Sequence, residues 1–462
     1  MTELWRLTAS ELAPLVADRH VSVTQAVASV LERINSVNPA LNSIVQRMDE
    51  EARAAAEAAD KRLADGATPG PLTGVAVTIK VNVDQAGHAT TNGLRAQAGL
   101  VADVDSPVVA NLRKAGAIVV GRTNTPAFSL RWFTRNSLHG ETINPRNQTL
   151  TPGGSSGGAG AAVASGMGAI GHGTDIAGSI RYPAYACGVH GLRPSLGRVP
   201  GFNATAGDRL IGGQLMAVSG PLARSIPDLR LALAAMAMRD TRDPWWQAMP
   251  MQGADAPRRV AYVEAPDGMP VAQPIRDALR AAAAKLSDAG YVVEEVRPPP
   301  MRESMLLQLR LWMAEFRHDA AAALRAENDP DANFVYAQMT RHCPDIDLHG
   351  MMATLKARAR LTRLWRTFLA DWPLVLCPVS GQLPFTNHLD VASSDAFDAV
   401  LEAQLPMIAP PFMGLPGLTV TTGSAGLSPV GVQLVADQFR EDLLLDAGEI
   451  LSPNPVALAL AK

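Results

Sequence analysis

The sequence contains few cysteines and no cluster of metal-binding side chains. Its three cysteines, Cys187, Cys343 and Cys377, are odd in number and widely separated, which argues against a disulfide framework or a zinc site. Their mostly apolar neighbours predict buried thiols instead. Because no group of Cys, His and Asp residues has the spacing of metal ligands, we expect neither a metal nor another cofactor.

The sequence also lacks a strong charge of either sign and a long apolar segment. Its 41 basic and 44 acidic residues give a formal net charge of −3, which is not the electrostatic signature of a nucleic-acid-binding protein. No run reaches the roughly 18 uninterrupted apolar residues of a membrane helix, and the N-terminus has no apolar core of signal-peptide length. We therefore expect a cytoplasmic monomer or homodimer that acts on a small molecule, without a nucleic-acid or membrane partner.

Alternating strand and helix patterns predict an α/β protein with a mixed or parallel sheet. Residues 72–83, dense in Val and Ile, predict a core strand, and residues 107–115 and 117–121 predict the next helix and strand. Two capping boxes in the first forty residues predict two helices that end before Pro39. Further strands are predicted at 42–47, 259–264, 291–296, 374–378, 418–422 and 429–436, and further helices at 49–64, 274–289, from 302 onward, 355–371 and 440–451.

One stretch, residues 151–183, concentrates glycine and small nucleophiles. Its segment GGSSGGAG holds five glycines with Ser155 and Ser156, a density that indicates backbone positions where a Cβ would be forbidden. A flexible linker would not run into an apolar segment, and a nucleotide-binding loop would carry Lys where Ala159 stands. A hydrolase elbow needs a preceding strand, but residues 144–152 contain two prolines and two asparagines. We interpret the stretch as an active site.

A lysine, Lys80, lies inside the apolar segment GVAVTIK. A buried ammonium is costly unless it is paired or neutralised, so this position predicts a functional role. The alternative is an edge strand whose lysine points into water. His172 and His190 flank Ser179 in the sequence and leave a Ser–His pair open, although we expect both to be neutral structural histidines.

These segments resemble the motifs of the amidase signature family. The family carries a GGSSGG segment, an apolar helix and a G-T-D-x-G-G-S-x-R-x-P block, which reads GTDIAGSIRYP here at residues 173–183. The resemblance implies that Ser179 is the nucleophile and that Ser155 follows a cis peptide bond. It also implies that Lys80 is the ultimate base, in its neutral form, and that Ser155 relays the proton to it from Ser179.

Three positions differ from the family pattern. Ala177 stands where the family usually has Gly, Ala76 where it has Pro, and Val81 where it has Asp. If position 177 requires a positive φ, alanine there would strain the turn by about 1 kcal/mol and weaken catalysis.

The resemblance implies an amidase, a hydrolase of linear carbon–nitrogen bonds other than peptide bonds, which forms an acyl-enzyme on Ser179. Aryl amides, esters and carbamates, including urethanes, carry a carbonyl of similar geometry and are further candidate substrates. The backbone N–H groups expected to hold the developing oxyanion are those of Ile176, Ala177, Gly178 and Ser179.

The resemblance covers residues 72–225 and, more weakly, residues 375–451. It implies a single large domain, residues 1–462, in which a central mixed β-sheet is covered by helices on both faces. Residues 240–345 diverge and are expected to shape the substrate side of the site. Two other functions stay open, namely the amidase-like subunit of a glutamyl-tRNA amidotransferase and a non-catalytic phosphate-binding module in which Lys80 would contact the phosphate.

Overall fold

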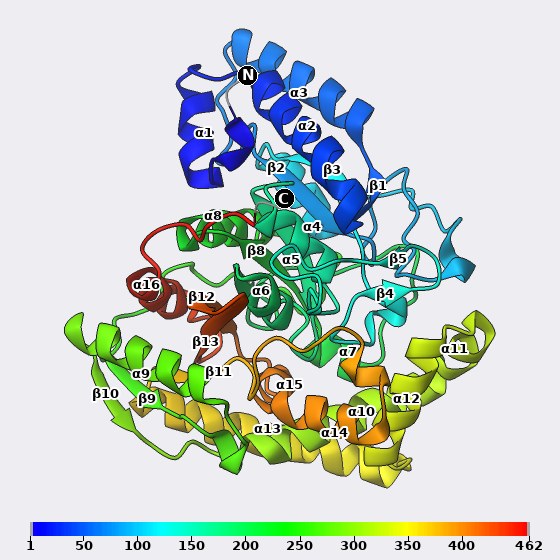
Figure 1. The fold of residues 1–462 in the computed structure, drawn as a ribbon, viewed down its shortest axis with the longest axis vertical. Coiled ribbons are helices and arrows are strands. Elements are labelled where there is room, and N and C mark those ends of the chain that lie inside the picture. Colours follow the sequence, from blue (N-terminus) through cyan, green and yellow to red (C-terminus); the bar gives the residue numbers. More distant parts are fainter. Residues whose placement is uncertain (1–2, 460–462) are drawn as a thin grey trace.

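The chain folds around one mixed β-sheet of 11 strands, seen in a computed structural model that describes residues 3–459 (Figure 1). The strand order is β1-β3-β2-β6-β8-β7-β12-β13-β11-β9-β10. Strands β3, β2 and β6 run parallel in one half, as do β11, β9 and β10 in the other, and all remaining neighbours pair antiparallel. The bounds are β1 Ile44–Arg47, β2 Ala76–Lys80, β3 Ile118–Thr123, β6 Ile170–Asp175, β7 His190–Arg193, β8 Val218–Ala223, β9 Arg259–Tyr262, β10 Val292–Glu295, β11 Leu374–Pro378, β12 Gly417–Ala425 and β13 Ser428–Ala436, with β4 Arg135–Asn136 and β5 Gly140–Glu141 in a separate small sheet.

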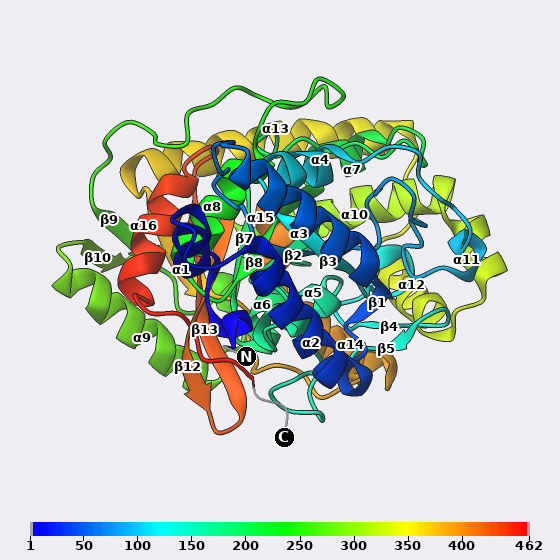
Figure 2. The same ribbon diagram turned by 90° about the horizontal axis from the view of Figure 1, so that it is seen from above.

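Helices surround this sheet. In Figure 1, α1–α3 lie at the top and α10–α15 at the bottom, and in the view from above α9 and α16 lie opposite α11 and α12 (Figure 2). The bounds are α1 Ala9–Ala17, α2 Val23–Leu41, α3 Asp49–Ala64, α4 Pro107–Lys114, α5 Gly157–Ala164, α6 Arg181–Cys187, α7 Ile211–Met216, α8 Ile226–Met236, α9 Gln273–Asp288, α10 Met301–Asp319, α11 Ala321–Glu327, α12 Pro330–His342, α13 Leu348–Asp371, α14 Ser394–Ala403, α15 Leu405–Phe412 and α16 Glu441–Leu451.

The two faces of the sheet pack into different apolar clusters. Along β2, Val77 and Ile79 join residues of α4, α8, α9 and α16, whereas Ala76 joins residues of α2 and α5. Because side chains alternate across a strand, Lys80 lies on the face of Ala76, toward α5. The predicted α/β fold, a central mixed sheet covered by helices on both faces, is confirmed.

Two helices differ in length from those predicted. Both capping boxes are present, but α2 continues through Pro39 to Leu41. A proline in the last turn removes a single backbone hydrogen bond, and Asn42 closes the helix in the left-handed conformation. Helix α13 begins at Leu348, earlier than predicted, because the Asp347 side chain caps it.

Strand β2 is shorter than the predicted segment 72–83. Gly74, with a φ of +83°, forms a turn before the strand, and the N–H of Val83 donates to the carbonyl of Lys80 in a turn after it. Lys80 is therefore the last residue of a central strand, at the point where the chain leaves the sheet.

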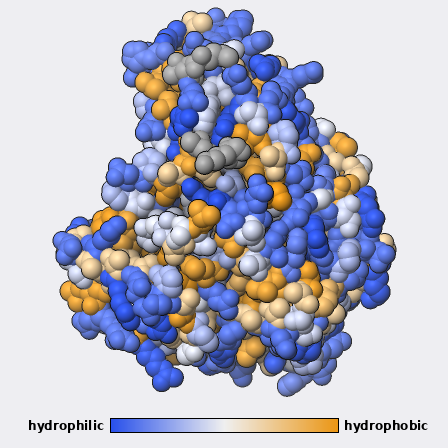
Figure 3. Space-filling view, viewed as in Figure 1, coloured by the Kyte–Doolittle hydropathy of each residue, from blue (hydrophilic) through white to orange (hydrophobic). Residues whose placement is uncertain are grey.

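The cysteines and the surface agree with a globular domain. Cys187, Cys343 and Cys377 are buried thiols without disulfide partners, as predicted. Within residues 3–459, no helix is both long and apolar enough to cross a bilayer. On the face shown in Figure 3, hydrophobic residues form small groups between hydrophilic ones.

Helix α5 is enclosed by protein along its whole length. All its residues, 157–164, are buried. A Cβ on Gly158 would lie 2.5 Å from the backbone nitrogen of Asn124 and 2.7 Å from the carbonyl oxygen of Ser43. The glycine density of this segment thus allows close backbone approach, which fixes the helix directly after Ser155 and Ser156.

We expect Gly158→Ala to destabilise the protein by about 1–3 kcal/mol, because the added methyl group overlaps backbone atoms that cannot rotate away. Gly99→Ala is the matched control: nothing lies within 4 Å of a Cβ at that position, so its effect should stay within about 0.5 kcal/mol. Urea unfolding followed by circular dichroism compares the two variants. Equal unfolding midpoints would contradict the close packing of α5.

Candidate active site

Lys80 ends β2 and is completely buried. Its Nζ lies 2.6 Å from Ser155 Oγ, 3.0 Å from Ser156 Oγ and 3.0 Å from Thr174 Oγ1. Strand β6, parallel to β2, carries Thr174, and the turn before α5 carries the two serines. Three hydroxyl groups thereby surround the buried amine. Because β2 lies between β3 and β6, the alternative of an edge-strand lysine in water is wrong.

The environment of Lys80 favours its neutral form. Burial lowers the pKa of the Lys80 amine well below its ordinary value of 10.5, and the nearby charge of Asp175 opposes this shift only in part. A neutral amine has two N–H donors and one lone pair. The three hydroxyl contacts suit such an amine, which can donate to two of them and accept a proton from the third.

Ser155 and Ser179 line the same cavity, which has a volume of about 310 Å³. The peptide bond between Gly154 and Ser155 is cis, as the family resemblance implied. The loop of Ser179 lies against the loop of Ser155, since the N–H of Ser156 donates to the carbonyl of Ser179 at 3.2 Å. Within residues 3–459, Ser179 Oγ makes no hydrogen bond, which leaves it available to a molecule in the cavity.

The backbone N–H groups of residues 176–179 are not equivalent. The N–H of Gly178 donates to Asp175 Oδ1 at 2.9 Å. The N–H groups with no acceptor among the described residues are those of Ile176, Ala177 and Ser179. Of the four donors expected from the sequence, three are therefore available to a ligand, and Gly178 serves the loop instead.

Glycine is required at position 178 rather than at position 177. Gly178 has a φ of +97°, and a Cβ there would lie 2.5 Å from Met407. Ala177 is not among the residues with positive φ. The departure from the family pattern at Ala177 therefore carries no backbone strain of the kind considered above.

The buried carboxylate of Asp175 holds this loop together. It accepts from Arg181 Nε and Nη2, each at 3.0 Å, and from the N–H groups of Gly178 and Ile180. Arg193 Nη1 lies 3.4 Å from Asp175 Oδ1 and donates to its backbone carbonyl at 2.6 Å. Burial alone would raise the pKa of Asp175, but the two guanidinium groups outweigh it and lower the pKa to about 2. The carboxylate is ionised at any pH at which the protein works.

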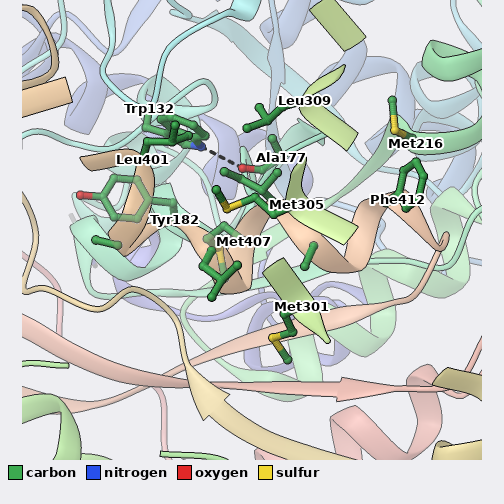
Figure 4. Packing of buried hydrophobic residues seen from close by; sticks show 14 of the residues in the cluster. Trp132, Ala177, Tyr182, Met216, Met301, Met305, Leu309, Leu401, Met407 and Phe412 are labelled. Atoms are coloured by element: carbon green, nitrogen blue, oxygen red, sulfur yellow. Dashed lines mark hydrogen bonds between the residues drawn. The ribbon is translucent and has the colours of Figure 1, made fainter. Parts of the chain in front are cut away.

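Two side chains from distant segments orient the loop. Trp132 Nε1 donates to the carbonyl of Ala177 at 2.8 Å, the contact drawn in Figure 4, and Gln308 Nε2 of α10 donates to the carbonyl of Ile176 at 3.0 Å. In a trans peptide unit the C=O and the N–H point in opposite directions. By holding the carbonyl of Ile176, Gln308 fixes the direction of the N–H of Ala177.

The cavity has an apolar wall and a polar rim. The apolar wall consists of Leu100, Phe128, Ile176 and Trp312, and Phe128 packs edge-on against Phe316 with ring centroids 5.8 Å apart. The polar side chains away from the serines are those of Asn82, Thr90, Asn92, Gln97, Ser129, Asn203, Thr205 and Arg209. Such a cavity fits a molecule with a hydrophobic body and polar ends.

Neither flanking histidine contacts the two serines. His172 Nδ1 accepts the backbone N–H of Lys80 at 3.4 Å, and its Nε2 lies 3.0 Å from Ser219 Oγ. His190 Nδ1 accepts the N–H of Thr421. Burial lowers the pKa of each imidazole to about 3, with the charges of Lys80 and Arg122 adding to the effect on His172. Both are neutral, hydrogen-bonded side chains.

The structure brings together Lys80, Ser155 and Ser179, which sequence motifs had selected, and adds residues that they had not. Thr174 and Ser156 lie inside recognised motifs, so their position beside the motif residues was a usable signal. Trp132 and Gln308 carry no such signal, because they reach the loop from remote parts of the chain. Among residues 3–459, no group of three or more His, Cys, Asp or Glu side chains could hold a metal ion.

Comparisons with known proteins give the same assignment over nearly the whole chain. The family model named Amidase matches residues 25–445. An indoleacetamide hydrolase of Bradyrhizobium diazoefficiens is 40% identical over 460 residues, which are 99% of this chain and 88% of the relative. The amidase-like subunit of a glutamyl-tRNA(Gln) amidotransferase from Moorella thermoacetica is 31% identical over 477 residues, 96% of each chain.

A solved structure adds support from the fold. A bacterial aryl acylamidase belonging to the amidase signature enzymes superposes with a TM-score of 0.85, at 26% identity and 97% coverage of both chains. With the Gly/Ser motifs, the 11-stranded sheet and the Lys–Ser arrangement described above, these matches assign the fold and the reaction class. The chain belongs to the amidase family, the amidase signature enzymes.

Proposed function

We propose that this amidase hydrolyses its substrate through an acyl-enzyme on Ser179, with Ser155 and Lys80 as the proton relay. The observation that carries the proposal is the 2.6 Å contact between Lys80 Nζ and Ser155 Oγ inside a buried site. A serine hydroxyl is a weak nucleophile until a base takes its proton, and a buried lysine with a lowered pKa is such a base.

In the proposed reaction, Ser179 Oγ attacks the amide carbonyl carbon while its proton passes to Ser155 and the proton of Ser155 passes to Lys80. The carbonyl oxygen becomes an oxyanion held by the N–H groups of Ile176, Ala177 and Ser179. When the C–N bond breaks, the proton held on Lys80 returns through Ser155 to the leaving nitrogen. Water, deprotonated by the same relay, then attacks the acyl carbon, and the carboxylic acid leaves Ser179.

We propose that the substrate is a small amide with an aryl or alkyl body. The apolar wall formed by Leu100, Phe128, Ile176 and Trp312 supports this class. The similarity to an indoleacetamide hydrolase and to an aryl acylamidase supports it further. Esters and carbamates, including urethanes, are candidate secondary substrates because their carbonyl group has the same geometry.

A second candidate function is that of a glutamyl-tRNA amidotransferase component, to which the chain is also similar. That function requires partner proteins and glutamine, so copurification of a tagged chain from its own cells discriminates it from a free amidase. The phosphate-binding alternative has little support, because Lys80 Nζ is surrounded by three hydroxyl groups instead of an open cavity. Cytoplasmic location and a monomeric or homodimeric state stay predictions.

Ser179→Ala should lower amide hydrolysis by about 10⁴-fold or more, because it removes the attacking oxygen. Thermal unfolding should be unchanged, since Ser179 Oγ makes no hydrogen bond to the described chain. Hydrolysis of phenylacetamide and indole-3-acetamide, followed by ammonia release, measures the loss. Turnover close to that of the wild type would rule out Ser179 as the nucleophile.

Ser155→Ala and Lys80→Met should each lower kcat by about 10²–10⁴-fold, the usual contribution of general acid–base catalysis. The double variant should be no slower than the slower single variant, because both changes interrupt one relay. Ser137→Ala, which changes a hydroxyl bound to Asp329 outside the cavity, is the control. Multiplicative losses in the double variant would contradict a shared relay.

Activity should rise with pH through a single ionisation whose midpoint lies below 10.5, the ordinary pKa of lysine. Below its pKa, Lys80 is protonated and cannot accept the proton of Ser155, so activity is lost as the pH falls. His172→Gln and His190→Gln should leave the kcat/KM profile unchanged, because both imidazoles are already neutral above about pH 3. An ionisation that disappears in either histidine variant would favour a histidine base.

A further inference from the structure

Arg209 stands where the catalytic cavity meets a second cavity. It lines the catalytic cavity and also the neighbouring cavity of about 270 Å³. The two cavities share three other residues as well, Asn203, Ala206 and Ala217. The side chain of Arg209 is exposed to this space, although the surrounding protein lowers its pKa and Asp243 opposes that shift. A guanidinium group remains charged under such conditions.

The charge of Arg209 has no partner among residues 3–459, where its guanidinium makes neither a hydrogen bond nor an ion pair. The carboxylate of Asp243 is used elsewhere, since it accepts the N–H groups of Gly201 and Trp245, each at 2.8 Å. Arg242, the other arginine of the second cavity, is paired with Asp240 at 2.6 Å. Of these two arginines, Arg209 is the one left to bind a ligand.

The catalytic cavity offers no competing carboxylate to Arg209. Asp175 is the one acidic residue that lines it, and both its oxygens are bound by arginine and backbone N–H groups. Asp208 and Asp243 line the second cavity only. An anion attracted by Arg209 would therefore lie on the side of the catalytic serines.

The loop that carries Arg209 is anchored at both ends. Before it, the N–H and the hydroxyl of Thr205 donate to the buried carboxylate of Asp84, at 2.9 and 2.6 Å. After it, Glu315 of α10 accepts the N–H groups of Gly212 and Gly213. Fixed ends position an arginine in advance of binding, which reduces the entropy lost when a ligand is bound.

We propose that Arg209 binds a carboxylate of the substrate and selects amides that carry an anionic group at the end opposite the scissile bond. The inference rests on the proposed function and adds a substrate class to it. The hydrophobic body of such an amide would lie along Leu100, Phe128 and Trp312, and its carboxylate would form a two-pronged pair with the guanidinium of Arg209.

The test compares monoamides of succinic, adipic and suberic acid with butanamide, hexanamide and octanamide, which match them in length but carry no charge. In the wild type, kcat/KM for at least one monoamide should exceed that of its neutral match by about tenfold or more, the effect expected of a hydrogen-bonded charged pair. Arg209→Gln should abolish this preference and Arg209→Lys should retain part of it. The control Arg53→Gln, which removes an exposed positive charge on α3, should retain all of it.

Three outcomes overturn the proposal: the wild type prefers no monoamide, the preference persists in Arg209→Gln, or the only effect of that variant is weaker inhibition by hexanoate. The last outcome would assign Arg209 to the released acid instead of the substrate. Binding of the same six amides to Ser179→Ala, measured by calorimetry, tests Arg209 without turnover. If the wild type hydrolyses none of them, the proposed function fails for this class, and the calorimetry alone then decides whether Arg209 selects the carboxylate.

Discussion

The burial of one amine constrains the whole catalytic half of this protein. Lys80 lies at the end of a central strand with no exposure to solvent, where an amine without hydrogen-bonding partners would be strongly destabilising. The partners come from two other segments, the turn before α5 and the end of β6. These segments must meet at the end of β2, so the parallel pairing of β2 with β6 and the close approach of α5 are requirements of the site. The same burial lowers the pKa of the amine and so suits it to accept a proton.

A second buried charge organises the loop beside it. Asp175 ends β6 one residue after Thr174, and its carboxylate binds two arginines and two backbone N–H groups of the Ser179 loop. Because removing any one partner would leave a buried charge uncompensated, the loop has little freedom to rearrange. Its three available N–H groups are thus held in place before a substrate binds, which is the condition under which hydrogen-bond donors stabilise a transition state.

Reaction chemistry and substrate recognition come from different kinds of structure here. Lys80, Thr174 and the serines lie at the ends of strands or at the start of a helix, whereas the cavity walls come from loops and from α10. Phe128 lies in a short helical turn and Trp312 on α10, while Arg209 lies in the loop before α7. Substitutions in these walls can change which amide fits without disturbing the buried relay, since the two sets of residues share few contacts.

Local patterns in the sequence were enough to locate most elements and the reacting residues. The period of apolar side chains, the capping boxes and the Gly/Ser motifs depend on neighbours within a few positions, so the alternating α/β order, Lys80, Ser155 and Ser179 could be predicted. Element ends were less reliable, as at Pro39 and at residues 72–83, because turns and caps decide them. The strand order, the use of the Gly178 N–H by Asp175, the contacts of Trp132 and Gln308, and the unpaired charge of Arg209 were decided by tertiary structure alone. Each of these depends on which distant segments pack together, and no short-range pattern in the chain carries that information.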